Sequence, residues 1–174
     1  MKKKKIILLS IATLIFTLTL CGCNGGTTEK SQIIDANKYS GITSEELVKE
    51  MGEPEKIDEW NNTKSDGTKY PVKTYIYNSN KYEFLVADNK VIRLSVYSDK
   101  YMTGEGEDFN LNSKEDIFPM LGIEPSDNLT NVVDNNVALR YQMVSDKIAD
   151  VWLPEVKDKS FSMVKITYDL RYFE

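Results

Sequence analysis

The sequence has 174 residues, a formal net charge of −5, two cysteines and no histidine. Without histidine, and with both cysteines in the first 23 residues, it offers no Ser-His-Asp or Cys-His nucleophile, no zinc site of Cys or His ligands and no disulfide beyond that point. The excess of acidic residues argues against nucleic acid as a partner. We expect no metal and no other cofactor.

The first 22 residues have the segment order of a bacterial secretory signal. A basic stretch, Lys2–Lys5, precedes Ile6–Leu20, a run of 15 residues without a charge. That run is shorter than the roughly 20 residues that a membrane-spanning helix needs. A polar, glycine-bearing stretch, Asn24–Lys30, follows it. The order is typical of a signal peptide that is cleaved after export.

The end of this segment, Leu20-Cys21-Gly22-Cys23, resembles the bacterial lipobox. The resemblance implies transfer of a diacylglyceryl group to the Cys23 thiol and removal of residues 1–22. Acyl chains contribute about 0.8 kcal/mol per buried methylene, so two or more would hold the protein on the extracytoplasmic face of the cell membrane. The alternatives are an ordinary cleaved signal peptide and an uncleaved anchor helix.

Removal of residues 1–22 would leave 152 residues with a net charge of −9, because the signal contains four lysines and no acidic residue. This length suits a single domain over residues 40–174, or two fused halves over residues 40–110 and 111–174. Residues 23–39 are mostly polar and are predicted to form a flexible tether that begins at the lipidated Cys23.

A short helix is predicted at the start of the domain. Thr43 and Glu46 have the spacing of a capping box, and Gly52 with Pro54 ends the helix. Aromatic and β-branched residues in alternation then predict three antiparallel strands. These strands are Tyr70–Tyr77, Tyr82–Ala87 and Lys90–Tyr97, separated by turns at Asn78–Asn80 and Asp88-Asn89 and flanked by loops at Trp60–Gly67 and Ser98–Asn110.

A similar order of elements recurs in the second half. Residues 113–122 again suggest a capped short helix with a terminal glycine, and Glu124–Val133 is predicted to be a loop. Three further strands are predicted at Asn136–Val144, Lys147–Leu153 and Ser160–Tyr172, with turns at Ser145-Asp146 and Glu155–Lys159. The predicted class is α+β, with short helices packed on antiparallel sheet. A tandem α-β-β-β duplication is one of two alternatives for its organisation.

The segment Gly41–Pro54 resembles the start of modules in the SmpA/OmlA and beta-lactamase-inhibitor-protein-like (BLIP-like) group. Those modules begin with Gly-hydrophobic-Thr and an acidic helix that ends in Leu- or Met-Gly-x-Pro, and they continue into an antiparallel sheet. They occur in lipoproteins, and some are tandem duplicates. The resemblance implies a helix-over-sheet binding module and assigns no role to a particular residue.

The candidate binding residues are aromatic side chains and one arginine. Tyr75 and Tyr77 share one face of their strand, and Arg93 and Tyr97 share the polar face of another. If these faces coincide, they form a Tyr/Arg surface of the kind that is enriched at protein interfaces, which Trp152 would extend. The alternative for Tyr75, Tyr77 and Trp152 is packing in the core or under loops, with their polar tips at the edge. That alternative is favoured for Trp152, whereas exposure is favoured for Arg93 and Tyr97.

Two polar stretches have some of the residues of a calcium site but do not predict one. Counting from Asn62, the twelfth position is Lys73, where a calcium loop needs a bidentate glutamate. The acidic stretch Gly104–Asp108 is interpreted as a solvated loop.

The leading functional hypothesis is a non-catalytic, membrane-anchored binding or assembly module for an envelope protein or polymer. An alternative is a carboxylate-based hydrolase of cell-wall glycan, which would need two acids across a cleft with one of them desolvated. A solute-capturing lipoprotein is a third hypothesis, although 152 residues are few for a two-lobed clamshell.

Overall fold

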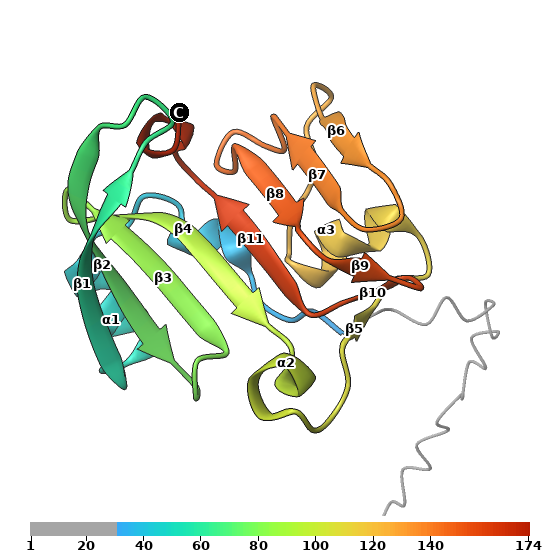
Figure 1. Ribbon diagram of the computed structural model, residues 1–174, viewed down its shortest axis with the longest axis horizontal. Coiled ribbons are helices and arrows are strands. Elements are labelled where there is room, and N and C mark those ends of the chain that lie inside the picture. Colours follow the sequence, from blue (N-terminus) through green and yellow to red (C-terminus); the bar gives the residue numbers. More distant parts are fainter. Residues whose placement is uncertain (1–30) are drawn as a thin grey trace, which may run out of the picture.

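The computed structural model describes residues 31–174, which form a curved antiparallel sheet with short helices packed against it (Figure 1). This arrangement confirms the predicted α+β class. The predicted signal segment, Cys23 and residues 24–30 of the predicted tether lie outside the described residues. Within the described part of the chain, no helix has the length and apolar character to cross a membrane.

The main sheet has eight strands in the order β1-β2-β3-β4-β11-β8-β7-β6. They are β1 (Lys56–Thr63), β2 (Lys69–Tyr77), β3 (Tyr82–Ala87), β4 (Lys90–Tyr97), β6 (Thr130–Asp134), β7 (Leu139–Gln142), β8 (Asp150–Leu153) and β11 (Met163–Thr167). A small second sheet contains β5 (Phe109–Asn110), β10 (Ser160–Phe161) and β9 (Val156–Lys157). The helices are η1 (Ala36–Tyr39), α1 (Ser44–Met51), α2 (Asp99–Thr103), η2 (Lys114–Asp116), α3 (Ile117–Met120) and η3 (Leu170–Tyr172).

The order of elements recurs in the two halves of the main sheet. In the first half α1 precedes the meander β1-β2-β3-β4, and in the second half α3 precedes β6, β7, β8 and β11. The last strands of the two halves, β4 and β11, pair antiparallel at the centre of the sheet, with Leu94 opposite Ile166. Each half therefore contributes four strands to the main sheet, and not the three that were expected. Whether this recurrence arose by duplication stays a prediction.

Four strands lie where the sequence predicted loops or turns: β5 and β9 of the small sheet, and β1 and β6, the two edges of the main sheet. β1 overlaps the predicted loop Trp60–Gly67, and β6 lies mainly in the predicted loop Glu124–Val133. Both strands are largely exposed along their length, so neither has the alternation of apolar and polar residues that marks a half-buried strand. The predicted loop Ser98–Asn110 also contains α2, whose first turn is capped by the Ser98 side chain.

Elements with strong local signals form as predicted. At α1, the Glu46 carboxylate accepts a hydrogen bond from the Thr43 N–H at 2.8 Å, and Thr43 Oγ1 accepts from the Glu46 N–H at 3.2 Å. Asp88 and Asn89 both have positive φ, as the tight turn between β3 and β4 requires.

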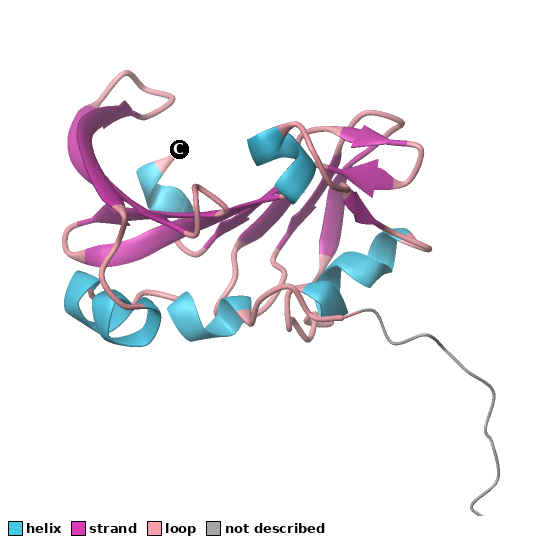
Figure 2. Cartoon of the chain, turned by 90° about the horizontal axis from the view of Figure 1, so that it is seen from below, coloured by secondary structure: helices cyan, strands magenta, loops and turns pink. Residues whose placement is uncertain are grey.

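One face of the main sheet carries most of the core. Helices α1, η1 and α3 lie on this side, which we call the covered face (Figure 2). Their buried residues Leu47, Tyr39 and Ile117 join apolar side chains from strands of both halves. The opposite face, which we call the open face, has a smaller cluster of Val72, Leu85, Ala87 and Ile92, against which the C-terminal Tyr172 and Phe173 pack.

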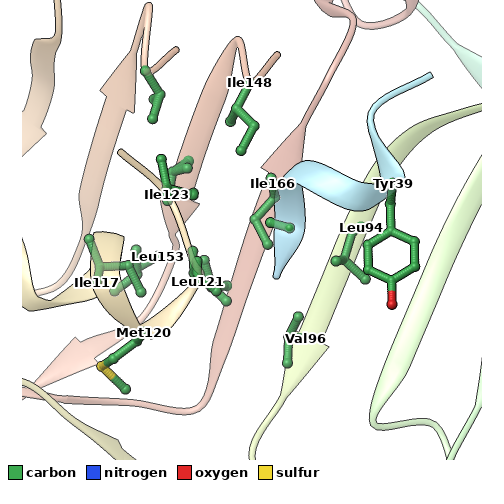
Figure 3. Close-up of a cluster of buried hydrophobic side chains, with 14 of the residues drawn as sticks. Tyr39, Leu94, Val96, Ile117, Met120, Leu121, Ile123, Ile148, Leu153 and Ile166 are labelled. Carbon is green, nitrogen blue, oxygen red and sulfur yellow. The ribbon is translucent and has the colours of Figure 1, made fainter. Parts of the chain in front are cut away.

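The segment of residues 33–39 belongs to the domain, although it was predicted to be part of the tether. The Ile33 N–H donates to the Met120 carbonyl at 2.7 Å, and the Ala36 N–H donates to the Leu121 carbonyl at 2.9 Å. On the other side the Tyr39 ring lies 4.8 Å from that of Phe84. The segment thus bridges the helix of the second half and the sheet of the first, near the junction of β4 and β11 (Figure 3).

Gly122 allows this segment to approach α3 closely. It has a φ of +66°, and a Cβ at this position would lie 3.1 Å from Asp35 Cα and would also collide with the Gln32 side chain. A residue larger than glycine would therefore strain the turn and displace the segment. The glycine that was expected to end the second helix also makes room for the N-terminal segment.

Candidate binding surface on the open face

The central strands of the main sheet carry a row of polar and aromatic side chains on the open face. Paired positions run from Glu83 on β3 through Ser95 on β4, Lys165 on β11 and Trp152 on β8 to Arg140 on β7. Since residues directly opposite each other on neighbouring strands point to the same face, these side chains lie side by side. The row is the candidate binding surface.

Trp152 is half-buried between two cations of this row. The Arg140 guanidinium carbon lies 5.7 Å from the Trp152 ring centroid, and Lys165 Nζ lies 5.2 Å from it. Both distances permit a cation–π attraction. The indole lies on the open face and keeps part of its surface accessible, so Trp152 is not a residue of the core.

Arg93 and Tyr97 lie on the same face, as the alternation in their strand indicated. Arg93 Nε donates to Thr167 Oγ1 at 3.1 Å, and its guanidinium carbon lies 3.6 Å from the centroid of the Phe173 ring. Burial lowers the pKa of the Arg93 guanidinium. The Tyr97 ring stacks on that of Tyr101, with centroids 5.1 Å apart. Both candidates are half-buried, so each has a fixed position and an accessible part.

Tyr75 and Tyr77 lie on the covered face, so they cannot share a surface with Arg93 and Tyr97. Their exposed fractions are 8% and 3%. Tyr75 is opposite Phe84 on β3, and the Tyr77 ring meets the Phe84 ring edge-on at 5.8 Å. Burial raises the pKa of the Tyr77 hydroxyl to about 12. These tyrosines are core residues, and their place in the expected binding surface is corrected.

Two carboxylates on the open face accept hydrogen bonds from neighbouring side chains. Asp150 on β8 is 2% exposed, and its Oδ2 accepts a hydrogen bond from Arg140 Nε at 2.6 Å. Burial raises the pKa of the Asp150 carboxyl, although the Arg140 charge opposes the shift. Glu83 Oε2 accepts from the Tyr97 hydroxyl at 2.8 Å. Burial, followed by this hydrogen bond, raises the pKa of Tyr97.

Lys165 is the cation of the row without such a partner. Its side chain is half-buried, and it forms no ion pair with a carboxylate of residues 31–174. Burial and then the nearby positive charge of Arg93 lower the pKa of Lys165. The alternation of Val164 and Ile166 with Lys165 was a signal for an outward-facing lysine that the sequence analysis did not use.

A separate cavity of about 770 Å³ lies at the β1 edge of the sheet. Its lining includes Trp60, Lys73 and the acids Glu45, Glu59 and Asp88. Glu45 is fully exposed, and hydrogen bonds from its own backbone and from Asn89 lower the pKa of its carboxyl. Asp88 accepts a hydrogen bond from the Tyr172 hydroxyl at 2.6 Å. Neither of these two acids is a desolvated carboxyl of the kind that a glycosidase acid requires.

No protein-family model matches the chain, and no curated protein is significantly similar to it. Among solved structures, it is similar to a cysteine-rich secretory protein from Staphylococcus aureus subsp. aureus Mu50, with 10% identity and a TM-score of 0.41 over 81% of this chain and 51% of that one. It is also similar to an extracellular protein containing a SCP domain from Bacillus anthracis str. Ames, with 15% identity and a TM-score of 0.40 over 87% and 51%. The chain therefore spans about half the length of each. The resemblance to SmpA/OmlA and BLIP-like modules stays a prediction.

Proposed function

We propose that this protein is a membrane-anchored extracytoplasmic lipoprotein whose open face binds another protein of the cell envelope. The observation that supports the proposal most is the contrast between the two faces of the main sheet. Helices and the N-terminal segment bury the covered face, whereas the open face presents Trp152, Tyr97 and Arg93 with part of each side chain accessible. Tryptophan, tyrosine and arginine are the residues that most often dominate protein interfaces.

An envelope polymer remains the alternative ligand for the same face. A carboxylate-based hydrolase is less well supported by the arrangement of acids. Glu83 and Asp150 lie on β3 and β8, which are three strand spacings apart in the sheet. At 4.7–4.9 Å per spacing their strands are about 14 Å apart, whereas paired glycosidase carboxyls are about 5–9.5 Å apart.

The lipid anchor is expected at Cys23, and intact-mass analysis of the protein purified from its own membranes should detect it. The expected mass corresponds to a chain that begins at residue 23 with acyl groups on the cysteine. Cys23→Ser should release the protein from the membrane fraction, because no acyl chain would then hold it there. A native protein with an unmodified thiol at residue 23 would disprove the anchor.

Binding through the open face is tested with the lipidated protein in solubilised membranes. After crosslinking and purification of a partner, the double variant Arg93→Ala and Tyr97→Ala should weaken its affinity by about 30-fold, since interface hot spots contribute about 2 kcal/mol or more. The matched control is Lys49→Ala with Glu50→Ala on α1, across the sheet from the open face. If both double variants bind the partner as tightly as the wild type does, the open face is not the binding surface.

A further inference from the structure

Two half-buried cations lie next to each other on the open face. Arg93 is opposite Thr167 in the β4–β11 pairing, and Lys165 is two residues from Thr167 on the same strand. Arg93 and Lys165 are thus diagonal neighbours, whose Cα atoms lie about 7–8 Å apart in an antiparallel pair. Their mutual repulsion is unfavourable, and burial weakens the screening by water.

No carboxylate of the described residues forms an ion pair with either cation, although the chain has 27 acidic and 22 basic residues. The carboxylates of this face have other donors, since Asp150 accepts from Arg140 and Glu83 accepts from Tyr97. Their negative charges still act at longer range, because Asp150 raises the pKa of Arg93 and Glu83 raises that of Lys165, but burial outweighs both effects. An anionic group between Arg93 and Lys165 would relieve their repulsion and would form charge-assisted hydrogen bonds with both.

The surroundings of the two cations favour a protein ligand over a uniformly charged polymer. Glu83 lies two strands from Lys165 in the same row and would repel a chain with a negative charge on every unit. A polypeptide can place one carboxylate at Arg93 and Lys165 and neutral or donor groups near Glu83. The exposed parts of Trp152 and Tyr97 offer apolar area to such a chain.

We propose that Arg93 and Lys165 together bind a side-chain carboxylate from an acidic segment of a protein partner, with Trp152 packed against the neighbouring residues of that segment. This inference rests on the proposed function and names the ligand chemistry of its binding surface. Lys165 is the cation that the test varies, because substitution of Arg93 would also remove its hydrogen bond to Thr167 and its contact with the Phe173 ring.

The two tryptophans allow a direct test. In a Trp60→Phe background Trp152 is the only indole of the chain, so its fluorescence reports on the open face. The probe is a short synthetic peptide with blocked ends and single glutamates separated by leucine and serine. We expect it to shift the Trp152 emission, with an apparent affinity that falls as NaCl is added because salt screens the charges.

Lys165→Met should weaken this peptide about tenfold, since one charge-assisted hydrogen bond contributes about 1.5–3 kcal/mol. Lys165→Arg should retain the affinity within about threefold, because it keeps the charge and a set of donors. These two variants separate loss of the cation from loss of fold. Lys69→Met is the matched control, since Lys69 is an exposed lysine of β2, three strands from Lys165.

The inference is overturned if a glutamine version of the peptide binds as well, if Lys69→Met weakens binding as much as Lys165→Met, or if inorganic polyphosphate binds more tightly than the peptide. Its failure differs from failure of the proposed function. If the affinity of a crosslinked partner falls when Arg93 and Tyr97 are replaced but not when Lys165 is replaced, only the proposed carboxylate site is disproved. If the peptide binds at Lys165 but the affinity of the crosslinked partner does not change in any open-face variant, the proposed function is disproved.

Discussion

Replacing Arg140 with methionine should lower the free energy of unfolding by about 3 kcal/mol at neutral pH, the low end of the cost of breaking a buried ion pair. The Asp150 side chain is 3% exposed and that of Arg140 is 35% exposed, and Arg140 Nε lies 2.6 Å from Asp150 Oδ2. Methionine keeps much of the aliphatic stem over the sheet but removes the charge. The variant would therefore leave a buried carboxylate with no ion-pair partner. Urea unfolding of the two proteins measures the difference.

The loss in Arg140→Met should depend on pH with a definite sign. Burial already raises the folded-state pKa of the Asp150 carboxyl above its ordinary value, and removal of Arg140 raises this pKa further. Between the unfolded-state pKa, about 3.9, and the folded-state pKa, the folded protein binds the proton more tightly. Stability relative to the wild type should therefore fall as pH rises through this window and should be regained on acidification towards about pH 4.

Two further variants test the cause of this effect. Adding Asp150→Asn to Arg140→Met removes the buried charge, so the double variant should recover much of the lost stability and its pH dependence. Lys114→Met breaks the ion pair between Lys114 and Asp134, which are 50% and 42% exposed. It should lower the free energy of unfolding by less than about 1 kcal/mol. An Arg140→Met loss that is the same at neutral and acidic pH would refute the buried-pair explanation.

Replacing Ile166 with alanine should lower the free energy of unfolding by about 3 kcal/mol, within the range for large-to-small changes in a core. Ile166 is fully buried on the covered face and is opposite Leu94 where the two halves meet (Figure 3). The cavity left by the shorter side chain would lie between β4 and β11, where the two halves meet. Ile57→Ala on the edge strand β1 is the matched control, because Ile57 is 44% exposed and its truncation should cost well under 1 kcal/mol.

The same variant tests whether the two halves unfold as one unit. Trp60 lies on β1 in the first half and Trp152 on β8 in the second, so Trp152→Phe and Trp60→Phe give one fluorescent reporter for each half. With residues 33–39 and the β4–β11 pairing between them, we expect the same urea midpoint from both reporters, and an equal decrease after Ile166→Ala. Separate midpoints would show that the halves are independent folding units.

The parts of the fold that the sequence predicted are those with local signals. The capping box of Thr43 and Glu46, the hairpin turn at Asp88-Asn89 and the alternation in β4 each depend on residues that are close in the chain. The same alternation placed Arg93 and Tyr97 away from Leu94 and Val96, and the structure confirms this. The edge strands were missed because a strand that is exposed on both faces has no such alternation.

Which side chains form the candidate surface depends on pairing between strands that are far apart in the sequence. Alternation shows that Tyr75 and Tyr77 share a face, but it does not show which face the helices cover. Trp152 lies beside Lys165 and Arg140 because of the register of β7, β8 and β11. That register depends on contacts between residues far apart in the sequence, and no local pattern contains it.

The sequence by itself determined the chemical character of this protein: it has no histidine, an excess of acidic residues, and short capped helices beside strands. These properties follow from residue identity and from interactions within a few residues of the chain. The signal peptide and the lipid anchor at Cys23 stay predictions from the sequence. Tertiary structure alone decided that residues 33–39 join the core, that two tyrosines are buried, and that Arg93 and Lys165 become neighbours. Such outcomes depend on which sheet face is covered and on how β4 pairs with β11, since burial and charge proximity are properties of the assembled fold.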